Sequence, residues 1–426
     1  MTTRVTRRWV SIAVIVLAAG LTAACGGALP PTSWSALVVS GQTAYLASTD
    51  RIYAIDTHPE TNNLQRQAWA FPPAGQNASV TFHSQPFVSE SGILYAGSDS
   101  SNERGVIFAL DTTQTINTGE VPNTTKTVNV KWSYPAGENP PPLGSVFGGV
   151  AYDSDSVYAG TSDGRVISLE ATPESEFGRL NWTFPPTTTE PIGRIWASPV
   201  VSGERVYVTS QDHYLYALNA ATGEQVWKFR AGAMLAGTPT VYGNSVYVGS
   251  FDQKLYALDA ATGAKKWEFT AQGWLWDGPA IFDNVLYFGD LNGNLYAVGL
   301  DGREIWRLTS GMQLTPDTQS GTQLKPGDKL EGMIRAQPLV TTDRIYVVTS
   351  ARKLFAINRT TKKPEKAEWA FTTPVDGESL LSTPVRVGDS LLIAPIPSGG
   401  SPTRLYAVNA KSGNLQWQFP APQAQP

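Results

Sequence analysis

Short runs of alternating apolar and polar residues recur along this chain, and most of them end at Gly, Asn or Asp. Between Arg205 and Phe229 the order is a run VYVTS, a turn, a run LYALN, a Thr-Gly turn and a closing WKF. The segment Ser245 to Phe269 repeats this order 40 residues later. Runs of this length and period predict β-strands, and the residues between them predict tight hairpin turns. With a further apolar run, often led by Pro, each copy predicts a sheet of four short antiparallel strands.

The tryptophan that closes each copy shows how often the unit repeats. It recurs eight times, at Trp69, Trp132, Trp182, Trp227, Trp267, Trp306, Trp369 and Trp417. Eight copies between residues 34 and 420 average about 48 residues each. A lone four-stranded sheet cannot bury two apolar faces, so the copies must pack on one another. The pattern therefore predicts an all-β fold, an eight-bladed β-propeller of four-stranded antiparallel blades, with these tryptophans filling the space between blades.

The turn between the last two strands of a copy carries a recognisable motif. Ala217-Leu218-Asn219-Ala220-Ala221-Thr222-Gly223 leads to Trp227, and the same pattern runs from Ala257 to Trp267. This motif resembles the PQQ-type propeller repeat, and eight copies behind a lipoprotein-like leader resemble the BamB-type outer-membrane assembly lipoproteins. The resemblance implies a quinoprotein-dehydrogenase-like propeller fold. It also implies a non-catalytic scaffold whose partner is an envelope protein or protein complex.

The first residues of the chain have the pattern of an export signal. Three arginines precede an apolar stretch from Val10 to Ala19, and small residues then lead to Cys25, the single cysteine. This resembles a bacterial lipobox, in which the cysteine is acylated after cleavage. We predict a signal peptide over 1–24, a tether over 25–33, the propeller over 34–420 and a tail over 421–426. An ordinary signal peptide or an uncleaved anchor remains an alternative to the lipid anchor on Cys25.

Composition narrows the functional classes. The 426 residues include 41% apolar and 16% charged side chains, with a formal net charge of −4 and no block of five like charges. We therefore expect no nucleic-acid partner. One cysteine and three histidines provide little for a metal site. We expect an exported, monomeric propeller in the periplasm or outside the cell, held to a cell membrane or outer membrane by its lipid.

Quinoprotein dehydrogenases share this repeat, and they provide the alternative function. The resemblance implies that such enzymes carry an adjacent Cys-Cys pair over the quinone and acidic calcium ligands beneath it. The present chain has no second cysteine. We therefore predict that it is not an enzyme and holds no PQQ. A propeller that binds PQQ or another small ligand remains the alternative interpretation.

Alignment of the copies on their first strand places one further set of residues near one mouth of the central channel. At or beside this position stand aromatic, methionine and arginine side chains, which are enriched where proteins bind one another. The candidate binding rim consists of Trp34, His83, Phe147, Trp196, Met234, Trp274, Trp276, Met333 and Arg335. Ala236 and Leu381 occupy the remaining two equivalent positions. These residues either have a structural role, plugging the channel or packing against adjacent loops, or receive an extended peptide, loop or ring-bearing ligand.

Overall fold

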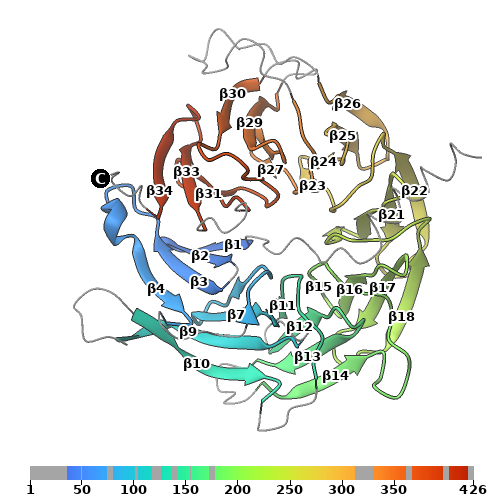
Figure 1. The fold of residues 1–426 in the computed structure, drawn as a ribbon. Coiled ribbons are helices and arrows are strands. Elements are labelled where there is room, and N and C mark those ends of the chain that lie inside the picture. Colours follow the sequence, from blue (N-terminus) through green and yellow to red (C-terminus); the bar gives the residue numbers. More distant parts are fainter. Residues whose placement is uncertain are drawn as a thin grey trace, which may run out of the picture. The chain divides into compact units, whose positions relative to one another are not determined.

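The computed structural model describes residues 36–48, 50–73, 80–100, 104–117, 126–136, 142–153, 155–171, 178–311, 330–360, 367–396 and 403–420. Within them the strands form eight four-stranded antiparallel sheets around a common centre (Figure 1). The predicted eight-bladed propeller is confirmed. The predicted signal peptide, Cys25, the tether, Trp34 and the tail lie outside the described residues. In the described part, no helix is both long and apolar enough to span a membrane.

Each blade is built from four strands that follow one another in the sequence, from the centre outward. The innermost strands are β1 (Ala36–Ser40), β6 (Phe87–Val88), β11 (Ala151–Asp153), β15 (Val200–Ser202), β19 (Thr240–Tyr242), β23 (Ala280–Phe282), β27 (Leu339–Val340) and β31 (Val385–Val387). The second strands are β2 (Thr43–Ser48), β7 (Ile93–Gly97), β12 (Ser156–Gly160), β16 (Arg205–Thr209), β20 (Ser245–Gly249), β24 (Val285–Gly289), β28 (Arg344–Val348) and β32 (Ser390–Ile393).

The third and outermost strands complete the blades. The third strands are β3 (Arg51–Asp56), β9 (Ile107–Asn117), β13 (Val166–Glu170), β17 (Tyr214–Asn219), β21 (Lys254–Asp259), β25 (Leu295–Gly299), β29 (Lys353–Asn358) and β33 (Leu405–Asn409). The outermost strands are β4 (Gln67–Phe71), β10 (Lys126–Tyr134), β14 (Leu180–Phe184), β18 (Gln225–Arg230), β22 (Lys265–Thr270), β26 (Glu304–Leu308), β30 (Ala367–Thr372) and β34 (Leu415–Phe419). A short 3₁₀ helix η1 (Asn63–Gln65) lies in the first blade, and β5 (Val80–Thr81) pairs with β8 (Asp99–Ser100) beside the second.

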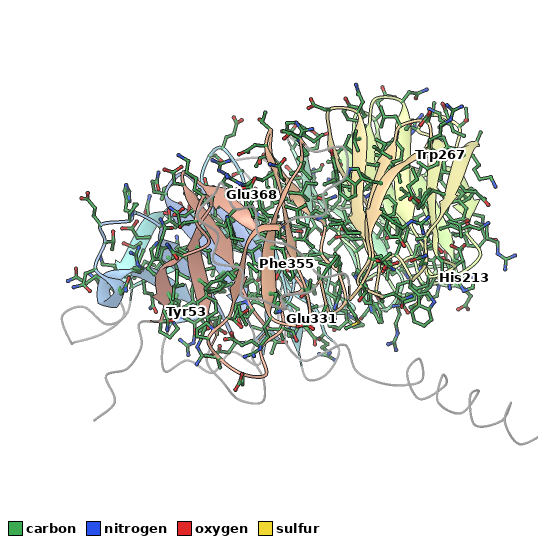
Figure 2. The ribbon with its side chains drawn as sticks, turned by 90° about the horizontal axis from the view of Figure 1, so that it is seen from above. Tyr53, His213, Trp267, Glu331, Phe355 and Glu368 are labelled. Carbon is green, nitrogen blue, oxygen red and sulfur yellow. The ribbon has the colours of Figure 1, made fainter. Side chains whose placement is uncertain are left out.

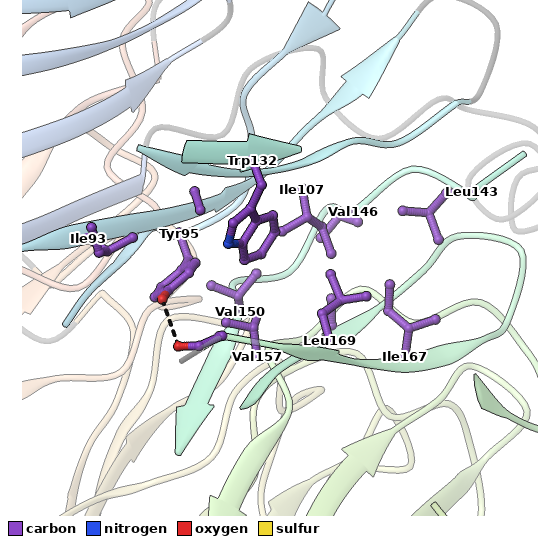
Figure 3. Close-up of a cluster of buried hydrophobic side chains, with 13 residues drawn as sticks. Ile93, Tyr95, Ile107, Trp132, Leu143, Val146, Val150, Val157, Ile167 and Leu169 are labelled. Carbon is purple, nitrogen blue, oxygen red and sulfur yellow. Dashed lines mark hydrogen bonds between the residues drawn. The ribbon is translucent and has the colours of Figure 1, made fainter. Parts of the chain in front are cut away.

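The hydrophobic core is divided into clusters, each of which fills the space between two neighbouring blades. Figure 3 shows the cluster between the second and third blades, where Tyr95 and Trp132 face Val157 and Leu169. The Tyr95 hydroxyl donates a hydrogen bond of 3.3 Å to the carbonyl oxygen of Ala171. Because every sheet buries both faces in this way, the blades hold one another in the ring.

The eight repeat tryptophans all lie on outermost strands. The indole of Trp227 donates to the carbonyl oxygen of Ala260 at 3.1 Å, and its ring lies against Gly263 in the turn of the next blade. The same two contacts join Trp182 to Ala220 and Gly223. The glycine of each Thr-Gly turn thus has two roles, since it takes a positive φ and leaves room for the tryptophan of the preceding blade.

The ring closes without an exchanged strand, because the first and last blades each contain four consecutive strands. The first blade lacks the Thr-Gly turn, and in its place the Arg66 guanidinium lies 4.1 Å from the ring centre of Trp417 in the last blade. Arg66 is buried and donates to the carbonyl oxygens of Asp56 and His58 at 3.1 and 2.8 Å. Side-chain packing therefore seals the ring.

The strands run between two faces of the propeller, which Figure 2 shows from the side. Two labelled residues lie near one face, namely His213 in the turn between β16 and β17 and Glu331 in the loop before β27. The labelled Glu368 lies near the opposite face. The loops that lead into the innermost strands and the turns between second and third strands meet at the first of these faces. We call it the mouth face, and it contains the candidate site.

Candidate functional site

A cavity of about 660 Å³ lies at the centre of the ring, and residues from all eight blades line it. In the seven blades whose loop before the innermost strand is described, the residue that stands just before that strand is part of the wall. These residues are His83, Phe147, Trp196, Ala236, Trp276, Arg335 and Leu381. The residue before each of them is a buried apolar side chain between blades, as with Ile195 and Leu275. Because side chains alternate along an extended backbone, the next one is directed into the channel.

Two tryptophans and an arginine form a stack in this wall. The rings of Trp196 and Trp276 lie 6.1 Å apart at an interplanar angle of 14°. They come from the fourth and sixth blades, and the fifth blade contributes only the small side chain of Ala236 at the equivalent position. The Arg335 guanidinium, from the seventh blade, lies 3.6 Å from the centre of the Trp276 ring. The Trp276 ring therefore contacts two planar groups, Trp196 from the blade two positions before it and Arg335 from the next blade.

An acidic side chain lies next to this stack. Asp277 accepts hydrogen bonds from the backbone N–H groups of Thr238 at 2.9 Å and Gly278 at 3.0 Å, so it joins two blades. Burial raises the pKa of Asp277 to about 6, although these hydrogen bonds and the charge of Arg335 oppose the shift. Burial also lowers the pKa of Arg335 to about 9, and the charge of Asp277 opposes that shift. The two groups form an electrostatic pair in the channel wall.

His83 and Phe147 lie in another part of the wall. Their rings are 6.3 Å apart and tilted by 37°. Burial lowers the pKa of His83, with an opposing effect from the charge of Asp99. A histidine in this state is neutral at neutral pH, so it contributes a polar ring to the cavity and no charge.

The predicted rim divides into two levels. Trp274, Met333 and Met234 are not part of the cavity wall and lie two residues before Trp276, Arg335 and Ala236. Trp274 is 37% exposed and Met333 44% exposed. Phe251, in the turn between β20 and β21, connects the levels, since its ring lies 5.1 Å from that of Trp274 and 5.5 Å from that of Trp276. We name Met234, Phe251, Trp274 and Met333 the mouth patch.

Sequence reasoning missed Phe251 and Asp277. A signal for Asp277 exists in the sequence, because small residues occupy its position in the other described blades. These residues are Ser84, Gly148, Ala197, Gly237, Ala336 and Ser382. Phe251 has no comparable signal, because it lies in a variable turn and only the ring geometry brings it to the tryptophans. Among the described residues, no group of three His, Cys, Asp or Glu side chains is placed to hold a metal ion.

The repeated blade, its tryptophan-to-turn contacts and the closed ring of eight define a PQQ-type repeat propeller. The family model described as outer membrane protein assembly factor BamB matches residues 173–321 and 271–426, which together span more than half of the chain. The chain belongs to this family. Comparison of the sequence with curated proteins gives no match.

Solved structures share the fold at low sequence identity. The crystal structure of BamB from Moraxella catarrhalis is 16% identical, with a TM-score of 0.56, covering 88% of this chain and 91% of that one. The computationally designed protein Ika8 is 12% identical, with a TM-score of 0.60, covering 88% and 97%. The quinohemoprotein alcohol dehydrogenase from Comamonas testosteroni is 16% identical, with a TM-score of 0.56, covering 81% and 68%. At these identities the likeness is one of fold alone.

Proposed function

We propose that this chain is a non-catalytic, lipid-anchored propeller scaffold of the bacterial cell envelope. In this proposal it contributes to outer-membrane protein assembly by binding an envelope protein or protein complex. Membership of the BamB family supports the assembly role. We propose the mouth patch as the binding surface on a single observation, which is that aromatic and methionine side chains are exposed together there on one face.

The loops beneath the mouth patch are held firmly, which favours binding. Leu275 and Ile334, which directly follow Trp274 and Met333, are buried between blades. The backbone N–H of Phe251 donates to the carbonyl oxygen of Met234 at 3.2 Å, and that of Leu291 donates to Trp274 at 2.9 Å. Because the backbone is already fixed, a partner that covers the patch has no loop to order, and the rigid Trp274 and Phe251 rings lose little side-chain entropy.

Co-purification from envelope extracts tests this proposal. The amount of β-barrel insertion machinery recovered with the wild-type chain is compared with that recovered by a Trp274→Ala/Met333→Ala variant. We expect the variant to recover about tenfold less, because loss of two central apolar anchors costs more than about 1.4 kcal/mol of binding. A Tyr242→Ala/Ile305→Ala variant is the matched control, since those side chains are 44% and 53% exposed but lie outside the mouth patch. Equal recovery by both variants and the wild type would exclude the mouth patch as the interface.

The lipid anchor is tested in the same extracts. A Cys25→Ala variant lacks the thiol that lipid transfer requires, and we expect it to be folded and to leave the membrane fraction without detergent. The acyl chain raises the local concentration of the propeller at the membrane, so partner recovery should also fall. A variant that still sediments with membranes contradicts the lipobox interpretation.

A quinoprotein-like, ligand-binding propeller is the second candidate, and the central cavity and the fold shared with the alcohol dehydrogenase favour it. The residues do not fit the ligand set that the resemblance implies. The chain has one cysteine, and Asp277 is the acidic residue among those that line the cavity. We therefore expect no spectral shift when the protein is titrated with PQQ and calcium, and no oxidation of alcohols. A stoichiometric shift would support the second candidate.

A further inference from the structure

None of the four mouth-patch residues lines the central cavity, which has the dimensions of a small-molecule site. Its volume of about 660 Å³ lies within the range of about 300–1,000 Å³ that is typical of ligand pockets. The wall is made by short loops that enter the innermost strands, and each loop is fixed by a buried residue between blades. A preformed cavity of this kind binds a ligand without reorganising the protein.

The charges in the wall add up to no net charge at neutral pH. Among the lining residues, the titratable groups are His83, Asp277 and Arg335. Burial lowers the pKa of His83, so it is neutral, and Asp277 and Arg335 carry opposite charges. An ion bound against this wall would lose part of its hydration and gain no net counter-charge. The cavity therefore favours an uncharged ligand.

The polar groups of the wall include both hydrogen-bond donors and acceptors. The Asp277 carboxylate is fixed by two backbone N–H groups, and Arg335 presents a planar set of N–H donors. The Gln337 side-chain amide is also fixed, because its nitrogen donates to the carbonyl oxygen of Pro279 at 2.9 Å. Neighbouring hydroxyl groups each need a donor and an acceptor, which these side chains provide. An entirely apolar ligand would cover these polar groups without forming any hydrogen bond to them, so it is a poorer fit than a hydroxylated one.

The lining also contains the aromatic side chains of Trp196, Phe147 and Trp276, the last of which has Arg335 over its ring. The face of an aromatic ring is negative, and C–H groups carry a slight positive charge, so a C–H-rich face packs on it favourably. A pyranose ring combines such a C–H face with hydroxyl groups around its edge. We propose that the central cavity binds an uncharged sugar, of one or two pyranose units. This goes beyond the scaffold function and does not depend on it.

Titration of the purified full chain with sugars tests the proposal. The panel contains glucose, galactose, N-acetylglucosamine and maltose, and binding is followed by tryptophan fluorescence and by saturation-transfer NMR. We expect at least one sugar to bind saturably. Asp277→Asn and Arg335→Gln should each weaken that binding about tenfold or more, because each removes a charged hydrogen-bond partner.

Two further variants keep the test decisive if either polar substitution perturbs folding. Trp196→Phe keeps an aromatic face in the wall and should weaken binding only severalfold. Ile305→Ala lies on the outermost strand β26, outside the cavity lining, and should leave the sugar affinity unchanged. The proposal is overturned if no member of the panel binds, or if Asp277→Asn binds as tightly as the wild type. Tighter binding of glucuronate than of glucose would also overturn it. None of these results depends on partner recovery, so the scaffold function is tested independently.

Discussion

Replacement of Gly263 by alanine tests whether the tryptophan-to-turn contacts hold the blades together. Gly263 has a φ of +72°, and a Cβ atom built on it would lie 2.6 Å from Cε3 of Trp227. The indole cannot move away freely, because it donates to the carbonyl oxygen of Ala260 at 3.1 Å. The left-handed backbone costs alanine about 1–2 kcal/mol, and the overpacking costs about 1–3 kcal/mol. We expect the free energy of unfolding to fall by about 2–5 kcal/mol.

Gly243 provides the matched control. It has a φ of +56°, and no atom lies within 4 Å of a Cβ built on it. Gly243→Ala should therefore cost only the backbone penalty of about 1–2 kcal/mol. Equilibrium urea unfolding, followed by far-UV circular dichroism, measures both variants.

A double-mutant cycle isolates the contact itself. In a Trp227→Ala background the clash is absent, so Gly263→Ala should cost no more than Gly243→Ala does in the wild type. The reasoning is refuted if Gly263→Ala and Gly243→Ala cost the same in the wild type. It is also refuted if Gly263→Ala lowers the free energy of unfolding by as much in the Trp227→Ala background as in the wild type.

Two further predictions concern the ring seam and the channel. Arg66→Ala removes the buried cation that lies over the Trp417 ring, together with the hydrogen bonds that Arg66 donates, and should lower the free energy of unfolding by about 2–4 kcal/mol. Urea unfolding measures this change, and an unfolding midpoint equal to that of the wild type would show that Arg66 does not seal the ring. Asp277 has a pKa raised from 3.8 to about 6, so the folded state binds its proton more tightly than the unfolded state. Protonated Asp277 therefore stabilises the folded state below pH 3.8, by an amount on the order of 2–3 kcal/mol. This stabilisation is lost as the pH rises toward 6. Asp277→Asn should remove this component from the pH profile of stability, and an unchanged profile would contradict it.

The blades could be predicted because their signals are local. In the segment Arg205 to Phe229, strand alternation, a turn at Asp212 and the Thr-Gly pair at Gly223 lie within one short stretch of sequence. The structure has β16, β17 and β18 there, in the expected order. The count of closing tryptophans then gave the number of blades. Local patterns carry this information because hairpins are formed by residues that are close in the sequence.

The candidate site could be predicted only in part. Alignment of the repeats placed His83, Phe147, Trp196, Trp276 and Arg335 at one position, and in the structure all of them line the cavity. The alignment could not separate this level from the mouth patch, because alternate side chains of one loop belong to different surfaces. Whether either level binds a partner stays a prediction.

The sequence by itself determined the strands, the turns and the eightfold repeat, since each depends on the conformation of a short stretch of chain. Only the tertiary structure decided that Trp196 and Trp276, 80 residues apart, stack across a blade that contributes Ala236. It also decided that Arg66 covers Trp417 at the seam. Such contacts depend on the angle between blades and on closure of the ring, which are properties of the packed molecule and not of any local pattern.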